Sequence, residues 1–312
     1  MNRLTDRKII LITRKTRLEN LVVKYNTIQQ AQFVIEHSGN DFSDYLEENH
    51  QYKNVLVQMI SVLEKMGNLH VLDREFVSNY IFGKDDIVIA VGQDGLVANT
   101  LKYLDNQPLI GVNPDKRRWD GVLLPFNSAD IEKVVTDVFR NKRRFKEITL
   151  AQADLNDGQS LYAVNDLFIG QRTHISARYT LDYYGKKEQQ SSSGIIVSTG
   201  LGSTGWFKSI LAGASGVAAT CSNRQISLRQ QEDFKWNSDF LYFSVREPYP
   251  CNWTSANLVF GRVDSTFYLK IVSQMPENGV IFSDGIENDF LEFNSGVEAT
   301  IKIADKKGIL VV

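Results

Sequence analysis

The sequence has few of the residues that mark disulfide-stabilised, metal-binding or strongly charged proteins. Its 312 residues include only two cysteines, Cys221 and Cys251, and four histidines, and the formal net charge at pH 7 is -2. Two thiols do not make a disulfide framework, so we expect a reducing compartment. The histidines lack metal-ligand spacing, which argues against a structural zinc site. A nearly neutral chain also gives no electrostatic reason to bind nucleic acid.

Long apolar runs are missing as well. No stretch is long enough to span a bilayer, and the first residues show no signal or transit peptide, so we expect a cytoplasmic protein with no membrane partner. What the chain does contain is 43% hydrophobic and 23% charged residues. That composition can fill a core and is unlike that of a disordered protein. A length of 312 residues is compatible with two domains.

The hydrophobic pattern changes near Glu147 and divides the chain into residues 1–146 and 147–312. The first part alternates strands with helices, as a doubly wound nucleotide-binding domain does. Apolar runs, helical spacing and a capping residue at Asn127 or Ser128 give the elements of this part. Strands are expected at 8–13, 85–91 and 109–112, and helices at 55–66, after the loop at 92–95, and at 128–139.

The second part is predicted to be rich in strands, because short apolar or alternating runs are separated by polar and glycine turns. These strands are expected at 160–164, 167–170, 176–182, 194–197, 240–245, 257–259, 265–272, 279–283 and 297–303. Helix patterns are scarce there, and the polar stretch 223–237 predicts a loop or insertion. We therefore expect an α/β N-terminal domain followed by a β-rich, β-sandwich-like C-terminal domain.

Two glycine-rich loops about a hundred residues apart carry most of the functional information. One is at 90–95, after an apolar strand, and the other is at 198–206, after a second such strand. Loops of small residues let backbone N–H groups approach an anion without a Cβ in the way. Two such loops suggest that two halves of the chain enclose a phosphate-bearing ligand. By itself, however, Gly92-Gln93-Asp94-Gly95 could also be a tight turn with a solvated aspartate.

The first loop resembles the Gly-Gly-Asp-Gly motif of the superfamily that contains NAD kinases, diacylglycerol kinases and phosphofructokinases. Further segments, in matching order and spacing across nearly the whole chain, narrow the resemblance to the NAD kinase family. These segments are Pro108-Leu109-Ile110-Gly111-Val112-Asn113, Val164-Asn165-Asp166-Leu167, the loop from Ser198 to Trp206, and Ser283-Asp284-Gly285. Within this family, the sequence most resembles the mitochondrial-type NAD kinases and their bacterial relatives. This resemblance lies in the segments 13–17, 113–115, 121–125, 192–194 and 243–248.

The resemblance implies a phosphotransferase with an alcohol acceptor, which transfers phosphate from ATP, carried with Mg²⁺, to the 2′-hydroxyl of the adenosine ribose of NAD. Asp94 would be the catalytic residue, deprotonating that hydroxyl, and no metal ligand from the protein itself is expected. The NAD-binding residues would be Gly92, Gly95, Asn165, Asp166, Ser203 and Thr204. Candidates for binding ATP or phosphate are Arg14, Lys15, Asn113, Asp284 and Gly285, of which the first two follow from position and charge.

The family resemblance further implies that the extreme C-terminus returns to the first domain. It also implies, together with open strand edges in the β-rich half, a homodimer or higher homo-oligomer. Two features beside the motifs are expected to have structural roles. Arg246 and Glu247 are expected to form an ion pair, and Trp206 is expected to be a packing or rim residue.

The chain departs from the family pattern at a few positions. Gln93 stands where the motif has its second glycine, Asp166 replaces a glutamate, and Gly200 and Leu201 replace Pro-Thr. If position 93 required a positive φ, glutamine there would cost about 1–2 kcal/mol. Two alternatives therefore stay open. One is a kinase of a sugar or lipid hydroxyl on the same scaffold, and the other is a non-catalytic NAD-binding protein.

Overall fold

The computed structural model describes residues 5–222 and 233–312. The chain divides into two compact units. Unit 1 comprises Met1–Lys146 with Ile309–Val312, and unit 2 comprises Glu147–Gly308. Of the predicted loop at 223–237, residues 223–232 lie outside the described residues.

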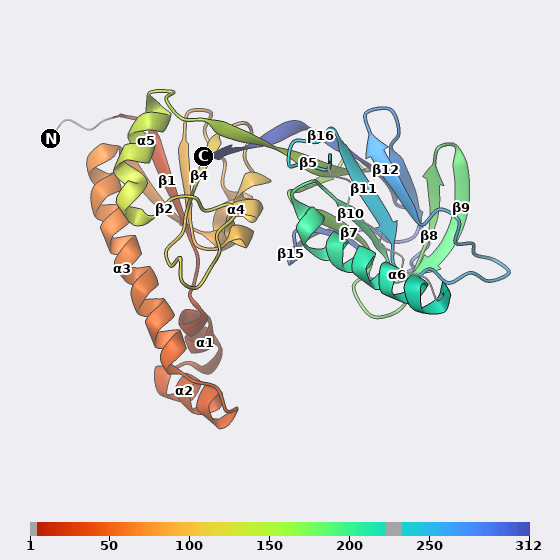
Figure 1. Ribbon diagram of the computed structural model, residues 1–312, viewed down its shortest axis with the longest axis horizontal. Coiled ribbons are helices and arrows are strands. Elements are labelled where there is room, and N and C mark those ends of the chain that lie inside the picture. Colours follow the sequence, from red (N-terminus) through yellow and green to blue (C-terminus); the bar gives the residue numbers. More distant parts are fainter. Residues whose placement is uncertain (1–4, 223–232) are drawn as a thin grey trace. The chain divides into compact units, whose positions relative to one another are not determined.

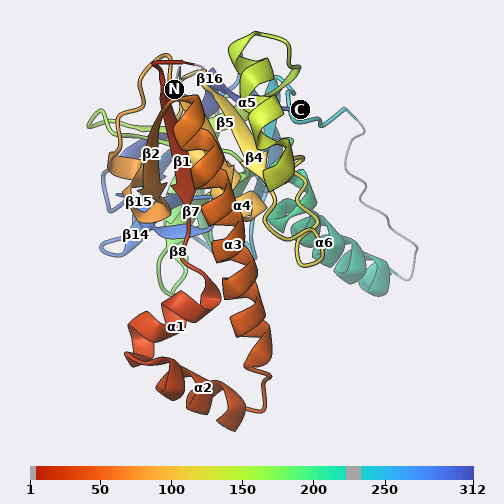
Figure 2. The same cartoon turned by 90° about the vertical axis from the view of Figure 1, so that its left-hand side faces the viewer.

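Unit 1 is built on a parallel sheet (Figures 1 and 2). Its strands are β2 (Asn68–Asp73), β1 (Lys8–Thr13), β3 (Ile87–Val91) and β4 (Pro108–Val112), in that spatial order, and β4 also pairs with the end of β16 (Glu298–Val311). Three of these strands, β1, β3 and β4, are almost wholly buried, as parallel strands with covered faces are. The structure therefore confirms the strands that were predicted at 8–13 and 109–112 from their apolar runs.

Helices lie on both faces of this sheet. The long helix α3 (Ser43–Met66) and α5 (Ile131–Phe139) pack on one face, and the short helix α4 (Asp94–Leu101) lies on the other (Figure 2). Two short 3₁₀ helices, η1 (Arg74–Asn79) and η2 (Ser128–Asp130), complete the unit's connections. Asn127 caps η2 through a reciprocal capping box with Asp130, and α5 follows directly. The predicted cap at Asn127 is confirmed, whereas α3 begins twelve residues before the predicted helix at 55–66.

Two helices in unit 1 were not predicted. They are α1 (Arg17–Tyr25) and α2 (Ile28–His37), which lie beyond the end of β1 beside the first turns of α3 (Figure 2). Thr16 and Glu19 form a capping box that starts α1. These helices share only a small core of Leu18, Ala31 and Phe42 with their neighbours, and each of the two buries a single residue.

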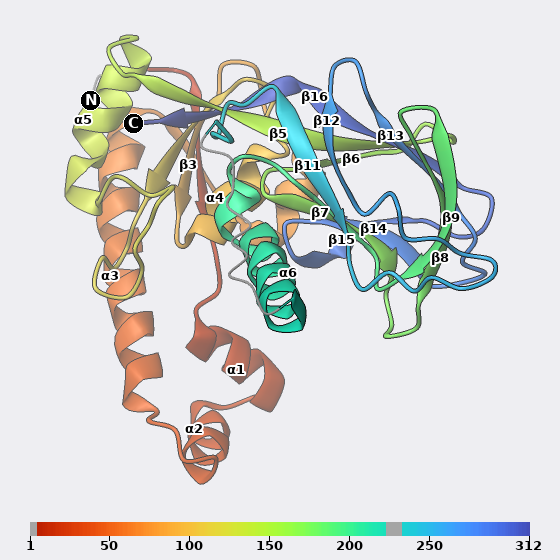
Figure 3. The same ribbon diagram turned by 45° about the vertical axis from the view of Figure 1, so that its right-hand side comes forward.

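Unit 2 contains two sheets that share one hydrophobic core (Figure 3). The first follows the order β16, β13 (Leu269–Ser273), β8 (Ala177–Tyr183) and β9 (Lys186–Ser192), and includes β5 (Phe145–Leu155) and β6 (Ser160–Ala163). The second is antiparallel in the order β12 (Phe260–Asp264), β11 (Phe240–Val245), β10 (Ile195–Ser198), β7 (Asp166–Gln171), β14 (Gly279–Ser283) and β15 (Ile286–Glu292). The α/β part and the β-rich part confirm the predicted fold class.

The structure corrects the predicted elements of unit 2 at a few places. Residues 257–259 are not a strand, because β12 starts only at Phe260, although the Val259 carbonyl accepts a hydrogen bond from Val245. Residues 265–268 precede β13 rather than belong to it. Strands β5, β9 and β15 and helix α6 (Trp206–Ser222), which follows the 3₁₀ helix η3 (Gly202–Thr204), were not predicted. Only Phe207 of α6 is buried, although Trp206, Ile210 and Leu211 also pack against buried residues.

Within the described ranges, no helix combines the length and the apolar character needed to cross a membrane.

Candidate active site

The first glycine-rich loop joins β3 to α4 in unit 1. Gly92 donates its N–H to the Val112 carbonyl at 3.2 Å, which fixes the loop to the neighbouring strand. A Cβ at Gly92 would lie 3.0 Å from Leu96 and 3.4 Å from Arg14. Gln93 has φ -115° and ψ 163°, an extended conformation that any residue adopts. The backbone of this loop therefore does not require a glycine at position 93.

Asp94 is the first residue of α4 and is half-buried. One of its carboxylate oxygens accepts a hydrogen bond from the Leu123 N–H at 2.6 Å, which orients the side chain. Gly95 follows, is exposed, and has no atom within 4 Å of the position that a Cβ would take. Open space beside the first N–H groups of a helix suits an anionic ligand.

Asn113 holds the loop that supplies Leu123. The residue is 3% exposed. Its amide nitrogen donates to the Trp119 carbonyl at 3.0 Å, and its amide oxygen accepts from the Asp115 N–H at 3.0 Å. Both ends of the side chain are thus used within the protein. Its proposed contact with phosphate stays a prediction.

Arg14 lies at the carboxyl end of β1 but is engaged in a buried ion pair. It is 7% exposed and donates to Glu48 at 2.9 Å, and Glu48 also binds Arg17. Burial alone would raise the pKa of Glu48, but the hydrogen bonds from the two arginines outweigh burial and lower it. Lys15, in contrast, is half-buried and pairs with Glu75 at 2.9 Å, which raises the pKa of the lysine.

Tyr52 is a residue of this region that sequence reasoning missed. Its hydroxyl donates to the Val91 carbonyl at 3.0 Å and accepts the Arg14 N–H at 3.0 Å. It therefore connects the carboxyl ends of β1 and β3, from which the motif residues extend. Burial raises the pKa of Tyr52 to about 12. The sequence signal that could have found Tyr52 is its helical spacing from Val55 and Met59, which places the three residues on the buried face of α3.

A cavity of ≈ 350 Å³ in unit 2 brings together most of the other predicted residues. Three separate segments contribute to its wall: the start of β7, the loop before α6, and the turn after β14. The lining residues are Asn165, Asp166, Leu201, Gly202, Thr204, Gly205, Trp206, Asp284 and Gly285. Ser203 is buried nearby, with its hydroxyl donating to the Gly200 carbonyl at 2.7 Å.

Asp284 organises this cavity through the backbone. It adopts φ 55° in the turn between β14 and β15. Its carboxylate accepts the N–H of Val164 at 3.1 Å and that of Asn165 at 2.6 Å, across about 120 positions of sequence. Asp284 is thus held by backbone groups and presents the segment that carries Asn165 to the cavity.

The second glycine-rich loop packs against the same segment. The Thr199 hydroxyl donates to the Val164 carbonyl at 2.6 Å. A Cβ on Gly202 would lie 2.0 Å from the Asn165 carbonyl oxygen, and a Cβ on Gly200 would lie 1.7 Å from the Lys235 carbonyl oxygen. These two glycines are needed because backbone approaches backbone, which explains the small residues of this loop.

Asp166 is the most distinctive group in the cavity wall. It is 9% exposed, and its carboxylate has no hydrogen-bond partner in the part of the chain that the structure describes. Burial, with a contribution from the charge of Asp284, raises the pKa of Asp166 to about 7. A buried carboxylate without a partner beside a cavity is a characteristic of ligand-binding sites.

The raised pKa of Asp166 leads to a stability prediction. The folded state binds this proton more tightly than the unfolded chain, so the carboxyl stabilises the fold below about pH 4, and this contribution is lost as pH rises to about 7. Asp166→Asn has no such titration. Its free energy of unfolding relative to wild type is expected to increase over this range by about 2–4 kcal/mol.

Urea unfolding of the ligand-free protein at about pH 4.5 and about pH 8 measures this difference. Asp239→Asn, at an aspartate that is 92% exposed in its side chain, is the matched control. An Asp166→Asn variant whose stability relative to wild type is the same at both pH values would refute the prediction.

Among the residues described, no cluster of three or more histidine, cysteine, aspartate or glutamate side chains could hold a metal ion. The candidate functional residues therefore fall into two groups: the oriented Asp94 with its glycine loop in unit 1, and the cavity around Asp166 in unit 2.

The fold of this chain is similar to the folds of two solved kinases. It is similar to the crystal structure of an NAD kinase from Archaeoglobus fulgidus in complex with ATP, with a TM-score of 0.55 and 14% identity over 98% of this chain and 93% of that chain. It is also similar to yeast NADH kinase complexed with NADH, with a TM-score of 0.56 and 15% identity over 99% of this chain and 84% of that chain. No protein-family model and no curated protein matches the sequence.

Proposed function

We propose that this protein is an NAD kinase, which transfers the γ-phosphoryl group of ATP to the 2′-hydroxyl of the adenosine ribose of NAD. The observation that carries the proposal is the cavity around Asp166. Five residues chosen from motifs, Asn165, Asp166, Thr204, Asp284 and Gly285, line it together. The similarity of fold to an ATP-bound NAD kinase and to an NADH-bound NADH kinase supports the same reaction.

In this proposal Asp94 is the general base. The ribose oxygen forms a bond to the γ-phosphorus, the bond from that phosphorus to the bridging oxygen of ADP breaks, and the proton of the hydroxyl passes to the Asp94 carboxylate. The hydrogen bond from Leu123 leaves the second carboxylate oxygen of Asp94 for this step. Phosphoryl transfer depends on positioning and charge neutralisation, which glycine loops and backbone N–H groups supply.

The cavity of unit 2 would bind the dinucleotide. Asn165 and an ionised Asp166 can accept hydrogen bonds from ribose hydroxyls or an adenine amino group, and Thr204 offers an exposed hydroxyl at the rim. Mg²⁺ would enter with ATP, whose phosphate oxygens are its preferred ligands.

The direct test is a coupled assay of NADP formation with purified protein, ATP, Mg²⁺ and NAD. NADH and inorganic polyphosphate replace NAD and ATP in parallel reactions to identify the preferred acceptor and donor. Titration calorimetry with NAD separates the alternatives. Binding without turnover would indicate a non-catalytic NAD-binding protein, and no binding would indicate a kinase of another hydroxyl substrate.

Gln93→Gly is expected to change kcat/KM by less than tenfold, which corresponds to about 1.4 kcal/mol of transition-state stabilisation. The reason is that Gln93 already has an extended backbone, so glycine relieves no strain. Steady-state kinetics on both proteins measures the ratio. A gain of a hundredfold or more would mean that the Gln93 side chain blocks the site, and would favour the non-catalytic alternative.

We further propose that the protein forms a homodimer or higher homo-oligomer, as its open strand edges suggest. Light scattering at micromolar concentration is expected to give at least twice the chain mass of 35.4 kDa. A mass near that of one chain would contradict this prediction.

A further inference from the structure

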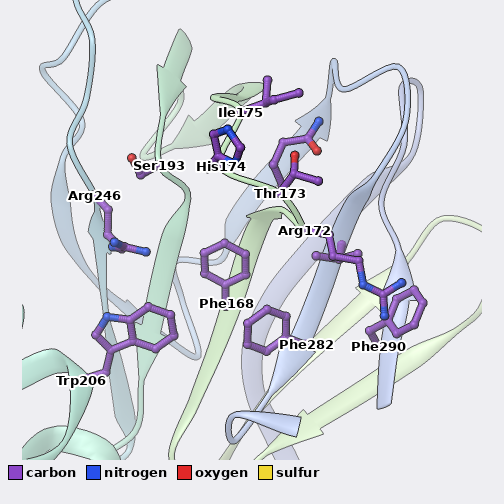
Figure 4. A pocket seen from close by; sticks show the side chains of 12 residues that line it. Phe168, Arg172, Thr173, His174, Ile175, Ser193, Trp206, Arg246, Phe282 and Phe290 are labelled. Carbon is purple, nitrogen blue, oxygen red and sulfur yellow. The ribbon is translucent and has the colours of Figure 1, made fainter. Parts of the chain in front are cut away.

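A second cavity of unit 2, of ≈ 340 Å³, lies over the sheet formed by β7, β10, β14 and β15 (Figure 4). It is called the aromatic pocket here. Its lining residues are Phe168, Gln171, Arg172, Thr173, His174, Ile175, Ser193, Trp206, Arg246, Val280, Phe282 and Phe290. Its size falls within the range of small-molecule sites, about 300–1,000 Å³. Of its lining, only Trp206 is shared with the cavity around Asp166.

Three aromatic rings form the floor of the aromatic pocket. Phe168 stacks on Trp206, with ring centroids 5.8 Å apart and planes 4° apart, and on Phe282, with centroids 4.7 Å apart. Figure 4 shows Phe168 between the other two rings. A Cβ at Gly170 or Gly194 would lie 2.8 Å or 2.7 Å from the Phe168 ring. Because neither glycine has a Cβ, the Phe168 ring can lie directly against the strands, and the backbone supports the floor of the pocket.

Cationic groups stand on both sides of these rings. The Arg246 guanidinium lies over Trp206 at 5.2 Å, and that of Arg172 lies over Phe290 at 4.4 Å. Figure 4 places Arg246 and Arg172 on opposite sides of Phe168. The described lining includes no aspartate or glutamate. The carboxylate of the exposed Glu247, which is not part of the lining, lies 3.5 Å from Arg246, so the predicted ion pair is confirmed.

We propose that the aromatic pocket is a second ligand site, which binds a planar aromatic group carrying an anion, as a mononucleotide does. The nucleobase would pack against Trp206 and Phe282, and the phosphate would pair with Arg246. Stacking on aromatic rings and pairing with arginine are the two interactions that recognise nucleotides without a dedicated loop. This site goes beyond the proposed kinase reaction and uses none of the residues assigned to it.

Titration calorimetry of the full chain with AMP tests the proposal. AMP is expected to bind, and adenosine and ribose 5-phosphate, which each lack one half of the recognition, are expected to bind at least tenfold more weakly. Arg246→Gln is expected to weaken AMP binding at least tenfold. Arg262→Gln is the matched control, because Arg262 also stacks on a ring, that of Phe240 at 3.9 Å, but does not line the aromatic pocket. Its AMP affinity is expected to stay within twofold of wild type.

AMP could instead occupy the cavity around Asp166, and Asp166→Asn distinguishes the two sites. AMP affinity unchanged in Asp166→Asn and reduced in Arg246→Gln supports the aromatic pocket. Failure of AMP to bind at millimolar concentration, equal affinity in Arg246→Gln and wild type, or loss of binding in Asp166→Asn overturns it. The NADP assay is independent of this result, since a chain without kinase activity can still bind AMP at Arg246.

Discussion

Asp94→Asn is expected to lower kcat by about 10²–10⁴, the usual contribution of a general base. Folding is expected to be unchanged, because asparagine keeps an oxygen that can accept the Leu123 N–H, as the carboxylate does at 2.6 Å. The loss would therefore be in chemistry alone. Steady-state NADP formation measures kcat, and urea unfolding measures stability.

Two further variants sharpen this test. Asp94→Ala removes the acceptor of the Leu123 N–H as well, so it is expected to lose activity and also about 1–3 kcal/mol of stability. Asp120→Asn, at an exposed aspartate of the loop that supplies Leu123, is the matched control and is expected to keep wild-type kcat. If Asp94→Asn retains activity, Asp94 is not the base.

Gly202→Ala is expected to abolish dinucleotide binding and to destabilise unit 2 by about 2–4 kcal/mol. The new Cβ would lie 2.0 Å from the Asn165 carbonyl oxygen, so the backbone that carries Asn165 must move. That movement would also break the hydrogen bonds that Asp284 accepts from this segment. Calorimetry with NAD and thermal unfolding measure the two effects.

Gly205→Ala, three residues later, is the matched control. The atom nearest to its Cβ position is 3.5 Å away, an ordinary contact, and the resembled family loop has alanine at the corresponding position. This variant is expected to keep stability within about 1 kcal/mol of wild type. Equal losses in both variants would mean that the loop is generally intolerant of change and that the approach of Gly202 to Asn165 has no special importance.

The sequence predicted the fold best where burial and periodicity act together. The apolar run at 8–13 is typical of a parallel strand that is covered on both faces, and it forms β1. Strand β9 was missed because its sequence is polar, and its buried end is stabilised by contacts that no local pattern encodes. One example is the hydrogen bond between Ser192 and Tyr179 at 2.7 Å. Helix α6 was missed although Phe207, Ile210 and Leu211 lie at helical spacing in it.

For the candidate site, the motifs predicted most of the residues that line the cavity, but not the hydrogen bonds and burial that define it. The sequence could not show that Asp284 accepts backbone N–H groups from residues 164 and 165, because this contact spans about 120 positions. Nor could it show that Asp166 is buried without a partner. Trp206 was interpreted as packing, and it does stack on Phe168, but it also lines two cavities. Such double roles depend on tertiary contacts alone.

The pairing of β4 with the end of β16 has a consequence for biosynthesis. Residues 309 and 310 pair with Pro108 and Leu109, so the last strand of unit 1 is translated only after the whole of unit 2. At a typical rate of about 5–20 residues per second, the 147–308 segment takes roughly 10–30 s to emerge. During that interval the edge of β4 is an unpaired, apolar template, the kind that pairs with other chains. The nascent chain therefore passes through a period in which chaperone binding at β4 would favour correct assembly.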